Sequence, residues 1–206
     1  MLSNKKSLWI VVLISLILFS CSKKKEEKPQ PWKDYNNSQV VQAEAQKYLG
    51  NDIAFAYKGS FDEDNKVEIA AGKAIENKNF SGIKFYLIKQ SDDDTFAISF
   101  ESDLLNGSFR QSLTKKIKFP QYNYELLYYN SQDYYLGSGG GEIYSYIVDF
   151  SLREVYLAHL VIDEGGPDLF LSKNIRDPEL KNFYISYFKK DYPNLKLLSK
   201  DISFGN

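Results

Sequence analysis

The chain has 206 residues, enough for one domain with appendages, and its 26 basic and 27 acidic residues give a formal net charge of −1. This balance argues against the basic surface that nucleic-acid binding requires, so no nucleic-acid partner is expected. A single cysteine excludes an internal disulfide and a cysteine zinc cluster, and a single histidine excludes a multi-histidine metal site.

Residues 1–20 have the three parts of an export signal. Lys5 and Lys6 give a positive start, and the apolar stretch LWIVVLISLILF follows and ends before Ser20. A helix of this length spans about 18 Å, which is short of the roughly 30 Å hydrocarbon layer of a bilayer. We therefore expect residues 1–20 to be a removable signal peptide, with a short signal-anchor that stays attached as the alternative.

The segment Leu18-Phe19-Ser20-Cys21 resembles the lipobox of bacterial lipoproteins, with an aliphatic residue three positions before the cysteine and a small residue directly before it. The resemblance covers residues 1–21 only. It implies that the Cys21 thiol is joined to a diacylglycerol, that the chain is cut before Cys21, and that a fatty acid such as palmitate is added to the new amino terminus. A free nucleophilic thiol is the alternative, but the stretch offers only lysines and glutamates as neighbouring charged groups.

The lipid implied on Cys21 makes a membrane the expected partner of this part of the chain. Two or three acyl chains give a stable anchor, whereas a single chain binds only marginally. Lys25, followed by Glu26 and Glu27, resembles the export tag that sends some lipoproteins to the outer face of the outer membrane. We expect an envelope lipoprotein of the outer membrane and leave open whether it faces the periplasm or the cell surface.

Residues 21–37 are polar, contain Pro29 and Pro31, and lack an apolar period. This composition predicts a flexible tether that reaches about 20 Å from Cys21 to the folded part. Residues 38–206 then form one β-rich globular domain.

The domain is expected to open with a short helix that Ser38 caps and Gly50 ends. From Ile53 to about Leu171, short β-branched or aromatic runs alternate with turn residues at spacings of roughly 8 to 12 residues. The 16 tyrosines and 14 phenylalanines of the chain suit such strands. The pattern predicts an antiparallel meander and argues against a doubly wound parallel sheet.

An amphipathic helix is expected after the strands, in DPELKNFYISYFKKDYP, with Asp177 as its cap and Pro178 at its first position. Its apolar side chains form one stripe, made of Leu180, Phe183, Tyr184, Tyr187 and Phe188. We therefore predict an α+β fold: a mostly antiparallel meander with a short N-terminal helix, and this C-terminal helix packed on the sheet. A cofactor or membrane role for the stripe is the alternative.

Tyrosines are concentrated in the middle of the chain, where eight of the 16 fall between residues 122 and 146. Neighbouring strands could align several rings on one face, and flat amphipathic rings suit glycans, peptides or protein partners. The ligand surface predicted from this cluster consists of Tyr128, Tyr134, Tyr144 and Tyr146. The alternative is that these rings form cross-strand pairs that hold the sheet and cover its core.

Two motifs that resemble catalytic or phosphate sites are expected to be structural. The glycine-rich segment 136–142 is followed by a predicted strand, whereas a phosphate loop needs a helix there, so we expect a hairpin loop. His159 lies in another predicted strand and has no catalytic partner identifiable from spacing. We expect a half-buried sheet histidine, no catalytic residue and no cofactor.

Acidic residues gather in three predicted turns, in FDEDNK, SDDD and DEGGPD. Asp62 and Asp64 begin like a calcium loop, but Lys66 takes the third acidic position and Val67 the place of the usual glycine. We therefore expect solvated turns and no metal site.

The function that these features favour is non-enzymatic. We expect an acyl-anchored envelope lipoprotein whose β-rich domain binds a protein or glycan partner. An immunity or inhibitor lipoprotein that neutralises a toxin or hydrolase at the envelope is the second hypothesis, and a hydrolase acting on cell-wall glycans is the third. The sequence predicts no oligomeric state.

Overall fold

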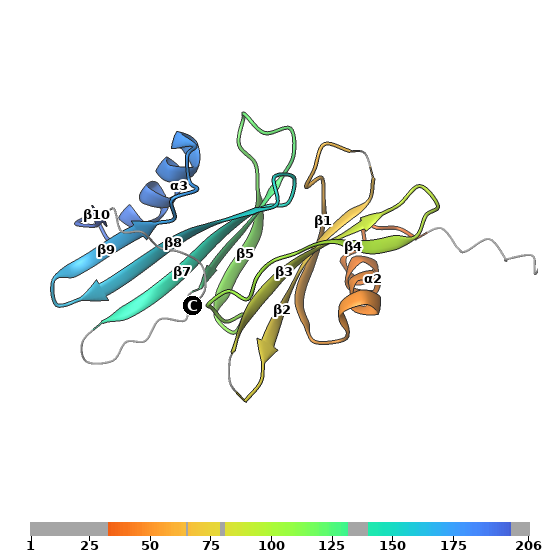
Figure 1. Ribbon diagram of the computed structural model, residues 1–206, viewed down its shortest axis with the longest axis horizontal. Coiled ribbons are helices and arrows are strands. Elements are labelled where there is room, and N and C mark those ends of the chain that lie inside the picture. Colours follow the sequence, from red (N-terminus) through yellow and green to blue (C-terminus); the bar gives the residue numbers. More distant parts are fainter. Residues whose placement is uncertain (1–32, 65, 79–80, 132–139, 199–206) are drawn as a thin grey trace, which may run out of the picture. The chain divides into compact units, whose positions relative to one another are not determined.

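The computed structural model describes residues 33–64, 66–78, 81–131 and 140–198. From Asp34 onward they belong to one compact unit. Its helices and strands, labelled in Figure 1, follow in this order: α2 (Ser38–Leu49), β1 (Ile53–Gly59), β2 (Glu68–Glu76), β3 (Ser81–Gln90), β4 (Phe96–Glu101), β5 (Ser112–Ile117), β6 (Leu126–Ser131), β7 (Gly141–Asp149), β8 (Glu154–Asp163), β9 (Gly166–Leu171), α3 (Pro178–Lys189) and β10 (Lys196–Leu198).

The strands form two sheets. Sheet A has the order β1-β2-β3-β4, and sheet B has the order β10-β9-β8-β7-β6-β5. All pairs are antiparallel except β10 with β9, which is parallel. The prediction of an α+β fold with mostly antiparallel strands is confirmed. The predicted meander is matched in part: consecutive strands pair within each sheet, but the chain leaves sheet A after β4 and starts a second meander at β5.

Both helices begin where a side chain accepts a hydrogen bond from the first turn. Asn37, and not the expected Ser38, caps α2 by accepting from the amide of Gln39 at 2.9 Å. Asp177 caps α3 as predicted, accepting from the amide of Glu179 at 2.8 Å, with Pro178 at the first helical position. Among the described residues, no helix combines the length and the apolar character needed to cross a membrane.

The main core lies between the two sheets and is rich in aromatic rings. Alternation along β3 shows how it forms: Phe85 and Leu87 belong to the core between the sheets, whereas Tyr86 belongs to the apolar cluster under α2. The Phe85 ring lies 5.7 Å from the ring of Tyr129 and 6.4 Å from that of Tyr146, measured between centroids, and both tyrosines come from sheet B. Sheet B therefore packs against the face of sheet A that carries Phe85 and Leu87.

Helix α3 packs on the other face of sheet B, as its apolar stripe predicts (Figure 1). Leu180, Tyr184 and Phe188 are buried there, and the Tyr184 hydroxyl donates to the carbonyl of Tyr156 at 2.9 Å. Sheet B is thus covered on one face by α3 and over part of its other face by sheet A.

Candidate functional site

A cluster of charged side chains lies where the core between the sheets ends. Glu68 of β2 and Lys89 of β3 are direct cross-strand partners, so they lie on the same face of sheet A. This is the face that carries the core residues Ala70 and Leu87 two positions further into the sheet. The turn from β1 to β2 covers this end of the core with the ring of Phe61, which is fully buried.

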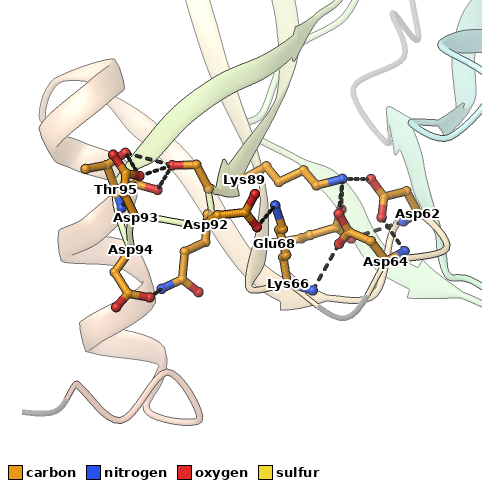
Figure 2. A network of polar contacts seen from close by, with 11 residues as sticks. Asp62, Asp64, Lys66, Glu68, Lys89, Asp92, Asp93, Asp94 and Thr95 are labelled. Carbon is orange, nitrogen blue, oxygen red and sulfur yellow. Dashed lines mark hydrogen bonds and ion pairs between the residues drawn. The ribbon is translucent and has the colours of Figure 1, made fainter.

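Three carboxylates surround the ammonium of Lys89 (Figure 2). Lys89 Nζ forms ion pairs with Asp62 Oδ2 and Asp64 Oδ2 and lies 3.7 Å from Glu68 Oε1. One oxygen from each of these three acids lies within 4.8 Å of the others. The turn and the two strands therefore bring three acids to one point that the chain itself occupies with a cation.

Backbone amides hold the remaining oxygen of each carboxylate. Asp62 Oδ1 accepts from the amide of Asp64 at 2.9 Å, and Asp64 Oδ1 accepts from the amide of Lys66 at 3.0 Å. Glu68 Oε2 accepts from the amides of Phe61 at 2.5 Å and Asp62 at 3.0 Å. Each acid is thus fixed by one oxygen and directs the other towards Lys89.

Burial sets the ionisation of this cluster. Glu68 is fully buried, and desolvation together with the neighbouring Asp62 raises the pKa of its carboxyl to about 7. Burial would also raise the pKa of Asp62, but hydrogen bonds from Lys89 and from the amide of Asp64 bring it below the ordinary value. Burial disfavours the Lys89 ammonium, yet its bonds to Asp62 and Asp64 raise its pKa above the ordinary value. The Glu68 carboxyl therefore keeps its proton to a higher pH than an ordinary glutamate does.

A cavity of about 510 Å³ adjoins the cluster. Its lining combines the acidic turn with residues of β3, β4 and the turn from β7 to β8: Asp62, Glu63, Asp64, Leu87, Lys89, Ser99, Phe100, Phe150, Ser151 and Arg153. Arg153 Nη1 donates to the carbonyl of Ser99 at 3.0 Å, and the guanidinium lies 5.7 Å from the centroid of the Phe100 ring. The φ of Arg153 is 58°, a left-handed conformation that favours glycine. The cavity therefore has acids on one side and a well-held cation on the other.

A second polar group lies on sheet B, on the face opposite α3. Tyr144 of β7 and His159 of β8 are cross-strand partners whose rings stack with centroids 4.4 Å apart and an interplanar angle of 9°. The Tyr144 hydroxyl donates to Glu142 Oε2 at 2.7 Å, and His159 Nε2 lies 3.1 Å from the same oxygen. The bond from Tyr144 and the nearby His159 lower the pKa of Glu142, while burial and Glu142 raise the pKa of Tyr144 to about 12.

This second group has two parts of a catalytic triad, a carboxylate and a histidine. A nucleophile would have to be within hydrogen-bond reach of His159. In the described part of the chain, the ring of His159 hydrogen-bonds to Glu142 and to no serine, threonine or cysteine. The geometry that is described therefore suits recognition through a ring stack and a carboxylate.

The structure describes three of the four tyrosines predicted to form a surface, and these three lie in different surroundings. Tyr128 is fully buried under α3, where its ring contacts those of Phe183 and Tyr187, and Tyr146 is buried between the sheets. The prediction is therefore wrong for Tyr128 and Tyr146, because both faces of sheet B are covered where they lie. Tyr144 is half-buried beside His159.

Two of the predicted site residues fall outside the described residues, namely Tyr134 and the lipidation residue Cys21. Most of the glycine-rich segment 136–142 lies outside them as well. Gly141 begins β7, so the predicted strand after this segment is confirmed.

The acidic turns differ from one another. Asp93 bonds within its own turn, to Ser91 and Thr95, and Asp163 accepts from the amide of Gly165 at 2.7 Å. The turn with Asp62 and Asp64 is different, because residues outside it bond to it. Glu68 accepts from its amides, and Lys89 forms ion pairs with its two aspartates. Neither residue is predicted from the sequence, because Glu68 lies beyond the turn and Lys89 lies on another strand. The available signal was the run of charged residues at every second position from 62 to 68.

Comparison of the chain with models of protein families, with curated proteins and with solved structures finds no significant match.

Proposed function

We propose that this protein is a lipid-anchored lipoprotein of the bacterial cell envelope whose folded unit binds a glycan and performs no catalysis. Support for the anchor comes from the sequence: the positive start, the short apolar stretch and the segment from Leu18 to Cys21. The proposed tether is the stretch between Cys21 and the compact unit, which begins at Asp34. Such a tether reaches about 20 Å, so the unit stands clear of the outer-membrane headgroups.

The stacked pair of Tyr144 and His159 is the observation that carries the binding part of the proposal. Sugar rings offer flat C–H faces that pack on aromatic rings and hydroxyls that donate to carboxylates. Glu142 is about half exposed and lies beside the stacked pair, so its carboxylate can accept hydrogen bonds from such hydroxyls. A ring stack with a carboxylate at its edge therefore suits a sugar better than an extended apolar peptide.

Glycan binding is tested with an array of bacterial envelope glycans and then by titration of the glycan that binds. Tyr144→Ala should weaken binding at least tenfold, because it removes one ring of the stack and the hydrogen bond to Glu142. Tyr48→Ala is the matched control, since Tyr48 is an exposed tyrosine of α2 far along the chain from this group. Absence of any bound glycan, or equal losses in both variants, would contradict the proposal and favour a protein partner such as a toxin.

The anchor is tested separately in the organism that makes the protein. Wild-type protein should fractionate with membranes, and mass spectrometry should find a diacylglycerol on Cys21. Cys21→Ser should move the protein to the soluble fraction. An unmodified sulfur in the native protein would remove the anchor from the proposal and leave the glycan site to be judged on its own.

A further inference from the structure

The point where Asp62, Asp64 and Glu68 meet has the features of a site for a hard cation. Three carboxylate oxygens converge there within 4.8 Å of one another, and amides of the turn fix the other oxygens. Hard divalent cations take such carboxylate oxygens as ligands. Three carboxyl groups face a single ammonium there, that of Lys89.

The surroundings of Glu68 indicate independently that the Lys89 ammonium does not pair fully with all three carboxyl groups. The Glu68 side chain is fully buried, and among the described residues no group donates a hydrogen bond to its Oε1. The nearest cationic atom is Lys89 Nζ at 3.7 Å, beyond hydrogen-bond distance. A buried carboxylate oxygen left in this way is costly unless another group contacts it.

We propose that Asp62, Asp64 and Glu68 form a calcium-binding site in which the ion takes the position of the Lys89 ammonium. The adjoining cavity gives the displaced lysine side chain and the water ligands a place, since Lys89 and both aspartates line it. Calcium needs six to eight oxygens at flexible angles, which three carboxylates and water can supply. Magnesium demands a stricter octahedron, and zinc prefers the nitrogen and sulfur ligands that this point lacks.

The affinity should be modest, because the ion must displace an ion-paired lysine. We expect a dissociation constant of about 10⁻⁴ to 10⁻³ M, the range of the weakly binding extracellular calcium modules. This inference is independent of the proposed glycan site, which lies on sheet B and uses none of the same residues.

Isothermal titration of the full chain with calcium chloride up to the millimolar range tests the proposal. Wild-type protein should bind one calcium ion. Glu68→Gln should weaken this binding at least tenfold, because glutamine can still accept from the turn amides but loses the charge. Asp93→Asn is the matched control, since it removes one exposed charge from a neighbouring turn, and should change affinity less than twofold. Lys89→Gln should bind calcium more tightly than wild type, because the competing ammonium is gone.

Thermal unfolding of wild-type protein gives a test that needs no variant. Calcium at ten times its dissociation constant should raise the melting temperature measurably above that in a chelator, because a ligand that binds only the folded state stabilises it. Absence of both heat and a thermal shift would overturn the proposal. Equal losses in Glu68→Gln and Asp93→Asn would overturn it as well, and equal affinity for magnesium would overturn its assignment to calcium.

Discussion

Glu68 stands out at the residue scale because its carboxyl is buried at the end of β2 with a pKa of about 7, against an ordinary value of 4.5. Between these two pH values, the folded state holds a proton on this group that the unfolded state has released. Stability therefore falls as the pH rises through this window, which is the reverse of the usual behaviour of a salt-bridged carboxylate. The shift sets an upper bound of about 3 kcal/mol on the effect.

Glu68→Gln tests this linkage, because glutamine retains the shape of the side chain and cannot titrate. The free energy of unfolding of the variant, relative to that of wild type, should increase from pH 5 to pH 7 and level off by about pH 8. Urea unfolding at each pH, in the presence of a chelator, measures this difference. Parallel pH profiles of the two proteins would show that Glu68 ionises normally.

At the residue scale, the tyrosines and the acidic turn show that the sequence predicts residue clusters but not their exposure or their distant partners. Residue types were informative: tyrosines clustered in neighbouring strands, and Asp62 with Asp64 resembled the start of a cation loop. Exposure could not be read, because Tyr128 is covered by a helix some 50 residues later in the chain. Lys89 could not be assigned to the turn, since only the pairing of β2 with β3 brings it there.

At the element scale, the caps of the two helices differ in how many hydrogen bonds they make. The side chain of Asn37 accepts one described hydrogen bond, from the amide of Gln39. Asp177 accepts from Glu179 and, through its other oxygen, from Gln121 and from the hydroxyl of Tyr122, both at 2.9 Å. The cap of α3 thus also ties the helix to the segment before β6.

Asp177→Ala should therefore destabilise the protein more than Asn37→Ala. Loss of one cap costs about 1 kcal/mol, and loss of the partners of Tyr122 and Gln121 adds about 1 kcal/mol more. Chemical denaturation of the two variants measures the difference. A larger loss in Asn37→Ala would show that the bonds to Asp177 contribute little.

A glycine lets β1 and β2 pack closely against the core between the sheets. A Cβ atom on Gly72 would lie 2.2 Å from Cε1 of Phe55 and 2.8 Å from Cζ of Phe109. Phe55 is buried and packs edge to face with the partly buried Phe109, so the Phe55 ring has little space to move into.

Gly72→Ala should cost about 1 to 3 kcal/mol of stability through overpacking. Phe55→Leu in the same chain should recover part of that loss, because the smaller side chain gives room to the added methyl group. A double-mutant cycle measured by urea unfolding separates this coupling from the cost of each change. Additive effects would show that the contact with Phe55 is not the cause.

The helices could be predicted more fully than the sheets because their signals are local. Asp177, Pro178 and the apolar stripe of α3 lie within 12 residues and define both its start and its buried face. The division of the strands into two sheets depends on contacts between distant residues. No single residue between β4 and β5 indicates that one sheet ends and another begins. The three exposed residues of β10 carry too short a pattern to be predicted as a strand.

At the scale of the whole molecule, the core side chains that the structure describes lie in the compact unit. Among the described residues, the first apolar side chain to join a cluster is Tyr35, which packs against the cluster under α2, and the first buried one is Val41. Ile69 and Ile88, both fully buried, depend on α2 for their cover. The unit should therefore fold without the tether but not without α2.

A fragment of residues 34–206 should unfold within about 2 °C of a fragment of residues 22–206, because every described side chain of the core clusters lies at Tyr35 or beyond. A fragment of residues 51–206 lacks Val41, Ala45 and Leu49, which are buried against sheet A. Each fully buried aliphatic side chain contributes about 1.5 to 3 kcal/mol, so this fragment should be destabilised by more than 3 kcal/mol or fail to fold. Calorimetry of the three fragments measures these differences. A large loss on removal of residues 22–33 would show that the tether packs on the domain, and the anchor would then hold the domain close to the membrane instead of at the full reach of a free chain.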